Sequence, residues 1–209
     1  MIGQAMIVAI GLTAQMLFGA RMLVQWILSE KQGVVVSPKI FWRFSLAASL
    51  LMCVYAWLQS DITILFGQLI TYFVYIRNLQ LKGDWKTYPA VLKVVIWSLP
   101  ILLLAVLLSG DINWQEKFFP TETGWLMLMG FVGQVLFTFR FIVQYYHAEK
   151  LKSSVLPRQF WVISLLGAAI IFCYGIFRMD YVLMIGHGGG MIAYIRNIMI
   201  DRKSASYAT

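Results

Sequence analysis

The sequence predicts an all-α integral membrane protein with seven transmembrane helices, built as two parallel three-helix repeats joined by a connector helix. Of its 209 residues, 60% are hydrophobic and 12% are charged, against about 45–50% and about 25% in soluble domains. The apolar residues fall into runs of about 20, the length at which a helix crosses the bilayer core. The chain also repeats itself at a spacing of 119 residues.

Seven apolar segments follow one another, and short polar stretches such as SEKQGVVVSPK separate them. The segments cover residues 4–28, 39–58, 62–81, 88–109, 123–147, 158–177 and 181–200. No basic region or cleavage site accompanies the first segment, so we expect it to remain as a span and not to leave as a signal peptide. The second and sixth begin just after Pro38 and Pro157, and proline suits the first turn of a helix. The fourth contains Pro100, which predicts a kink or a packing notch.

The internal repeat is gapless over three spans. Residues 11–82 align with residues 130–201, with 22 of 72 positions identical. The shared letters are Q-x-L-F-x-x-R-x-x-V-Q, then EK, V-x-P-x-x-FW-x-x-SL and YIRN. Apolar helices share Leu and Val easily, but they do not share Gln, Arg, Glu, Pro and Asn in register by chance. We therefore predict a duplication.

The fourth segment decides how the two copies are oriented. Each copy has an odd number of spans, so direct succession would invert the second copy; one extra crossing makes the copies parallel. We expect a first repeat over residues 1–83, a connector helix with an outer loop over 84–122, and a second repeat with a short tail over 123–209.

The loop charges predict the orientation in the membrane. One side carries Lys31, Lys39, Lys82, Lys86, Lys150, Lys152, Arg158, Arg202 and Lys203. The other side carries chiefly Asp61, Asp111, Glu116, Glu122 and Asp180. The positive-inside rule places the C-terminus in the cytoplasm and the N-terminus in the periplasm of a bacterial inner membrane. The same rule explains the net charge of +8 without a nucleic-acid partner.

Four arginines stand inside apolar segments, where each costs roughly +2.5 to +3.5 kcal/mol at a helix centre. They are Arg21, Arg77, Arg140 and Arg196. One alternative is structural, with these arginines paired to Glu30, Glu149 or backbone carbonyls. The other is a shared chamber for an anionic group, because a guanidinium fork matches phosphate and carboxylate.

Polar neighbours favour the chamber, since a polar cavity must hydrogen-bond its lining groups. Gln25 and Gln144 follow two of the arginines by one helical turn, and Asn78 and Asn197 directly follow the other two. Tyrosines and tryptophans complete the predicted ligand-binding set, the tryptophans serving either as cavity lining or as interface anchors. These aromatic residues are Tyr75, Tyr194, Trp42 and Trp161.

Catalytic patterns are not found in the sequence. It has no Ser-His-Asp set, no metal-ligand spacing and no close carboxylate pair at the predicted chamber. We therefore predict no catalytic residues, no metal and no cofactor, and the pattern disfavours an enzyme.

The repeated motif resembles the lipid A biosynthesis N-terminal domain family, in two tandem copies that cover nearly the whole chain. That family is similar in turn to the seven-helix SWEET sugar transporters and the PQ-loop proteins. Its members are associated with lipopolysaccharide synthesis or modification, and some are suspected of flipping undecaprenyl-phosphate sugars. The resemblance implies an anionic lipid or lipid-linked sugar as ligand.

Two functions follow from this resemblance. The first is an inner-membrane transporter or flippase for a lipid-linked sugar. The second is a membrane anchor or subunit that works with a glycosyltransferase, because the family is linked to lipid-A-disaccharide synthase. The soluble glycosyltransferase part itself is expected to be absent from this chain.

Overall fold

The computed structural model describes residues 3–58, 62–108, 124–179 and 181–206. Across this part of the chain the structure has seven α-helices and no strand, which confirms the predicted all-α class. The helices are α1 (Gln4–Gln32), α2 (Lys39–Leu58), α3 (Ile62–Leu81), α4 (Ala90–Leu108), α6 (Trp125–Leu151), α7 (Arg158–Phe177) and α8 (Tyr181–Ser206). A short 3₁₀ helix, η1 (Asp84–Thr87), precedes α4. The predicted outer acidic group, Asp61, Asp111, Glu116, Glu122 and Asp180, lies outside the described residues.

The distribution of polar groups is typical of a membrane protein. Within the described residues, four helical segments are long and apolar enough to cross a bilayer: Gln4–Gln32, Lys39–Leu58, Leu128–Leu151 and Arg158–Phe177. Large apolar side chains such as Val91 and Ile185 face outward, while Gln25, Asn78 and other polar residues are buried. An exposed apolar surface around a polar interior suits a lipid environment.

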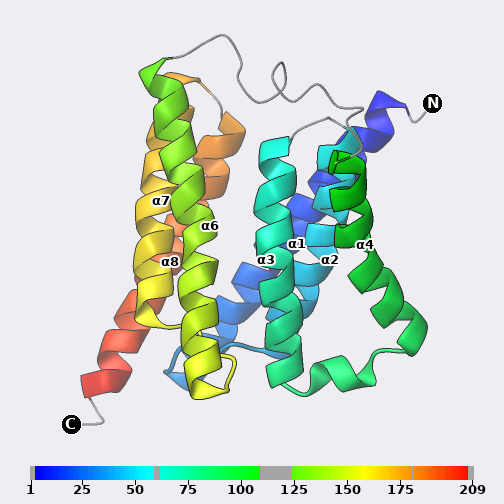
Figure 1. The fold of residues 1–209 in the computed structure, drawn as a ribbon. Helices are drawn as coiled ribbons and strands as arrows, with labels where there is room; N and C mark the ends of the chain where they lie inside the picture. Colours follow the sequence, from blue (N-terminus) through cyan, green and yellow to red (C-terminus); the bar gives the residue numbers. More distant parts are fainter. Residues whose placement is uncertain (1–2, 59–61, 109–123, 180, 207–209) are drawn as a thin grey trace.

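The helices form two groups of three (Figure 1). In the first half, α2 packs against α1 and α3; in the second half, α7 packs against α6 and α8. The halves meet where α1 contacts α8 and where α3 contacts α6. Figure 1 shows α1, α3, α6 and α8 running in one direction and α2, α4 and α7 in the other. The basic residues that follow α1, α3 and α6 therefore gather at one end of the bundle.

Helices α1 and α6 end at equivalent positions in the same left-handed backbone conformation. Gly33 after α1 has φ 67°, and Lys152 after α6 has φ 48°. Glycine adopts this conformation without a steric penalty, whereas lysine adopts it at a steric cost. At Lys152 the backbone N–H donates to the carbonyls of Ala148 and Glu149, which stabilises the turn.

An ion pair fixes η1 to α2. The Asp84 carboxylate is buried and accepts a hydrogen bond from Arg43 Nε at 2.7 Å. This bond, together with the positive charges of Arg43 and Lys39, holds the pKa of Asp84 below its usual range. The turn that leads into α4 is thereby held against the first half.

Helix α4 contacts α3 at its proline. Pro100 lacks an N–H, so the carbonyl of Ile96, four residues earlier, loses its helical partner. The Tyr72 hydroxyl on α3 donates to this carbonyl at 2.7 Å. The Phe73 and Trp97 rings also meet, with centroids 5.8 Å apart. The packing notch expected at Pro100 is therefore a hydrogen-bonded contact.

Replacing Tyr72 by Phe should destabilise the protein, because the Ile96 carbonyl would be buried without a partner. We expect a loss of about 1–3 kcal/mol, seen as a lower thermal unfolding midpoint in detergent. In a Pro100→Ala background the helical N–H returns, so the same Tyr72→Phe change should cost much less. Equal losses in the two backgrounds would show that the hydroxyl does not compensate for the proline.

Candidate functional site

Two of the predicted arginines occupy the interior of the bundle. Arg21 on α1 is 5% exposed and Arg140 on α6 is 2% exposed. Arg21 Nη1 donates to Ser45 Oγ at 2.7 Å and to Tyr75 Oη at 3.3 Å. The two arginines stand at equivalent repeat positions, so their surroundings can be compared directly.

The surroundings of Arg140 repeat those of Arg21. Arg140 Nη1 donates to Ser164 Oγ at 3.2 Å and to Tyr194 Oη at 3.3 Å. The ring of Phe141 lies 5.6 Å from the Arg21 guanidinium carbon and 4.8 Å from that of Arg140. Both charges therefore sit near one aromatic face, where cation–π attraction contributes about 0.5–2 kcal/mol. We call Arg21 and Arg140 the central arginine pair.

The central arginine pair has no carboxylate partner within the described part of the chain. No ion pair found there includes Arg21 or Arg140. The Nε atom of each is buried without a hydrogen-bond partner. Two neighbouring cations therefore keep N–H donors that no described side chain uses.

The other two predicted arginines are in ion pairs that cross between the halves. Arg77 on α3 binds the Glu149 carboxylate on α6, with Nη2 and Oε2 3.1 Å apart. Arg196 on α8 binds Glu30 on α1 in the same way, with the corresponding atoms 3.2 Å apart. The structural alternative, with arginines paired to Glu30 and Glu149, therefore describes these two. The four guanidinium groups do not form one shared chamber, because Glu149 and Glu30 hold Arg77 and Arg196 nearer the basic end of the bundle than the central pair.

The predicted amides bind each other across the halves. Gln25 on α1 and Asn197 on α8 exchange hydrogen bonds of 2.8 and 3.2 Å. Asn78 on α3 and Gln144 on α6 exchange bonds of 2.9 and 3.0 Å. None of the hydrogen bonds that these amides make within the described residues goes to one of the four arginines. Each glutamine lies one turn nearer the basic end than its arginine, level with an asparagine of the other half.

The predicted tryptophans are fully buried and pack against the tyrosines that bind the central arginine pair, so they are not interface anchors. Trp42 lies 6.2 Å from Tyr75, and Trp161 lies 6.1 Å from Tyr194, between ring centroids. Trp42 Nε1 donates to Ser37 Oγ at 2.8 Å. Trp161 Nε1 is buried without a partner, because the residue equivalent to Ser37 is Leu156.

Phe141 was missed by the sequence reasoning. It lies between the two central arginines, but its repeat equivalent is Met22, so the duplication gave no signal for it. Ser45 and Ser164 could have been included, since they are identical in both copies and lie one turn after the Phe-Trp pairs. No cluster of three or more His, Cys, Asp or Glu residues that could hold a metal occurs in the described ranges.

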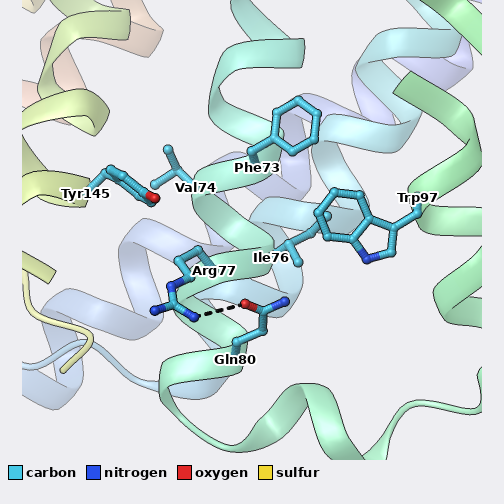
Figure 2. A pocket seen from close by; sticks show the side chains of 7 residues that line it. All are labelled: Phe73, Val74, Ile76, Arg77, Gln80, Trp97 and Tyr145. Carbon is cyan, nitrogen blue, oxygen red and sulfur yellow. Dashed lines mark hydrogen bonds between the residues drawn. The ribbon is translucent and has the colours of Figure 1, made fainter. Parts of the chain in front are cut away.

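A cleft of about 340 Å³ lies on the outer side of the junction between α3 and α6 (Figure 2). It is lined by Phe73, Val74, Ile76, Arg77, Gln80, Trp97 and Tyr145. We call it the lateral cleft. It contains one of the predicted arginines, Arg77, whereas the central pair lies deeper in the bundle.

The site therefore belongs to a helical membrane-type bundle with an arginine-containing polar junction between two matched halves. The Lipid A Biosynthesis N-terminal domain family matches the chain twice, over residues 10–80 and 129–199. Together these matches cover more than half of the chain, and the protein belongs to this family.

Relatives of the chain include lipid-A-disaccharide synthases. That of Chlamydia muridarum is 29% identical over 94% of this chain and 34% of the relative. That of Chlamydia abortus is 31% identical over 94% of this chain and 33% of the relative. The chain thus spans about a third of the length of these relatives. No solved structure matches the chain significantly.

Replacing Asn197 by Ala should destabilise the bundle, because the Gln25 amide would stay buried without its partner. We expect a loss of about 1–3 kcal/mol, measured from thermal unfolding in detergent. Replacing both residues by Leu should cost less than the sum of the single changes, since neither buried amide remains unpaired. Thr13→Ala, which removes an exposed hydrogen bond on α1, should change stability by less than about 0.5 kcal/mol. If Asn197→Ala unfolds like the parent, the amide pair does not hold the halves together.

Proposed function

We propose that the protein is a membrane module of lipid A biosynthesis that binds an anionic, phosphate-bearing lipid and works with a glycosyltransferase of the lipid-A-disaccharide synthase type. Family membership and the names of the relatives support this proposal. The share of the relatives that the chain spans also fits a module of a larger system. This glycosyltransferase-linked function is favoured over transport.

One observation carries the ligand part of the proposal: the two family copies meet at a central arginine pair that has no acidic partner among the described residues. Ionisable residues inside a membrane bundle mark functional sites by default, because an unpaired charge there is costly. The guanidinium fork offers parallel donors that match phosphate oxygens. We assign ligand contact to Arg21 and Arg140.

The remaining predicted residues support this site. The hydroxyl groups of Tyr75 and Tyr194 accept hydrogen bonds from Arg21 and Arg140. Trp42 and Trp161 pack against the rings of these tyrosines. The amide pairs and the ion pairs of Arg77 and Arg196 hold the halves together around it. They are Gln25 with Asn197, Asn78 with Gln144, Arg77 with Glu149, and Arg196 with Glu30.

The proposal includes a seven-span, SWEET-like arrangement in the bacterial inner membrane. The parallel course of the two halves supports it (Figure 1). The basic end of the bundle would face the cytoplasm, with the N-terminus in the periplasm. A cytoplasmic glycosyltransferase would then approach the same end.

A tagged full chain, purified in mild detergent from its own host, tests the proposal. The eluate should form a lipid A disaccharide from labelled precursors. The double variant Arg21→Gln/Arg140→Gln should retain the transferase but lower the activity about tenfold or more, as expected for loss of charge-assisted contacts. The control is Arg178→Gln, because Arg178 is exposed at the end of α7, and its side chain donates to Tyr174 Oη on the same helix. An eluate without synthase activity would count against the module function.

Transport of a lipid-linked sugar is the second candidate. The observation that favours it is the matched crossing of the halves, in which α1 meets α8 and α3 meets α6 through equivalent amide pairs. Parallel repeats that rock about a central site are a common transporter design. The central arginine pair would then bind the phosphate of an undecaprenyl-phosphate sugar.

Liposomes containing the purified chain test transport. They should move a labelled polyprenyl-phosphate sugar between leaflets faster than empty liposomes. Arg21→Gln/Arg140→Gln should reduce this rate toward the empty-liposome value, while Arg178→Gln should match the parent. If the parent moves the lipid no faster than empty liposomes, transport is wrong and the module function is unaffected.

A further inference from the structure

The lateral cleft has walls from three helices that belong to different parts of the chain. Phe73 comes from α3, Trp97 from α4 and Tyr145 from α6, and all three aromatic side chains are exposed. Figure 2 shows the Tyr145 hydroxyl pointing toward α3, with Arg77 and Gln80 below it. The volume of about 340 Å³ is within the usual range for ligand sites, about 300–1,000 Å³.

The charge of the lateral cleft is positive. Arg77 is the one charged residue among those that line it. Its partner Glu149 also accepts a hydrogen bond from Lys152 Nζ at 2.8 Å, so one carboxylate serves two cations. A guanidinium has five N–H donors, and those of Arg77 make three hydrogen bonds, to Glu149 and Gln80. Donors on both terminal nitrogens remain for an anionic group.

The cleft changes from polar to apolar with depth, as an amphiphile does. Arg77 lies four residues before the end of α3, which places it about 6 Å from the helix end. Lys82 follows that end, so Arg77 lies near the headgroup level. Phe73 is about 6 Å deeper along the same helix. A phosphate at Arg77 would therefore place an attached chain along the aromatic walls.

The other junction between the halves lacks this shape. Ile192 and Arg196 on α8 stand where α3 has Phe73 and Arg77, but no second copy of α4 covers them. This difference in covering changes the exposure of equivalent side chains: Ile76 on α3 is 1% exposed, whereas its equivalent Ile195 on α8 is 47% exposed. A second hollow of about 320 Å³ on α7 and α8 is lined by apolar residues and one arginine, Arg202, and has no aromatic residue. It is lined by Val162, Leu165, Leu166, Ile195, Ile198, Met199 and Arg202.

We propose that the lateral cleft binds one anionic phospholipid from the surrounding membrane, with its phosphate at Arg77 and an acyl chain along Phe73, Trp97 and Tyr145. The site makes the two junctions unequal, because only the junction of α3 and α6 is walled by α4. This lipid would bridge the two halves next to the ion pair of Arg77 and Glu149. The site does not depend on work with a glycosyltransferase, so the two proposals can fail separately.

Native mass spectrometry of the full chain, titrated with phosphatidylglycerol or phosphatidylcholine, tests the site. One phosphatidylglycerol should be retained in preference to phosphatidylcholine. Arg77→Gln should weaken that retention about tenfold, the order expected for loss of one charge-assisted contact. Arg196→Gln is the matched control, because it breaks the equivalent ion pair at the other junction and should leave retention unchanged. Trp97→Ala should weaken retention of both lipids.

Photo-crosslinking in lipid nanodiscs supplies a second measurement. A benzophenone residue in place of Phe73 should capture phosphatidylglycerol above its mole fraction, while the same residue in place of Ile192 should capture lipids in proportion. Equal capture at the two positions, or equal retention of the two lipids, would overturn the site. So would equal loss of phosphatidylglycerol from Arg77→Gln and Arg196→Gln, since that would reflect general loosening of the bundle.

Discussion

Two guanidinium groups, those of Arg21 and Arg140, lie where the two halves meet, and the surrounding structure has to compensate for their burial. Removing a charge from water costs several kcal/mol. Oriented hydroxyl groups offset part of this cost. Ser45 and Ser164 each donate to a carbonyl of their own helix, at 2.6 and 2.5 Å, which turns the lone pairs of each hydroxyl toward an arginine. Aromatic faces offset another part. The positive charge that remains is the basis for the proposed contact with an anionic lipid.

Polar residues along α1 are ordered by depth. Among Arg21, Gln25 and Glu30, Arg21 lies farthest from the basic end of the bundle. Gln25 lies one turn nearer that end, and Glu30 lies nearer still. The same order holds on α6 for Arg140, Gln144 and Glu149. In each case the amide and the glutamate find their partners in the opposite half. The amides therefore pair with amides and the glutamates with Arg77 and Arg196, whereas the Nε atoms of Arg21 and Arg140 are among the buried polar atoms without a hydrogen-bond partner in the described residues.

The halves have diverged where α4 packs. Helix α4 packs on α3 at Pro100, where the Tyr72 hydroxyl compensates for the missing N–H, and Ile76 is buried while Phe73 stays exposed. On the equivalent face of α8 the residues stay apolar but exposed. A duplicated fold has in this way acquired one walled junction and one open junction.

The sequence by itself determined the helices and the equivalence of residues within the two copies. Apolar runs of about 20 residues and the polar stretches between them set the helix boundaries, with starts at Lys39, Ile62 and Arg158 as predicted. A repeat, however, relates residues that occupy equivalent places, and it does not say which residues touch. The partners across the halves come from the packing of α1 on α8 and of α3 on α6. Only the tertiary structure therefore separated the central arginines from the glutamate-bound pair. Only it showed that Phe141, whose repeat equivalent is Met22, lies close to both central arginines.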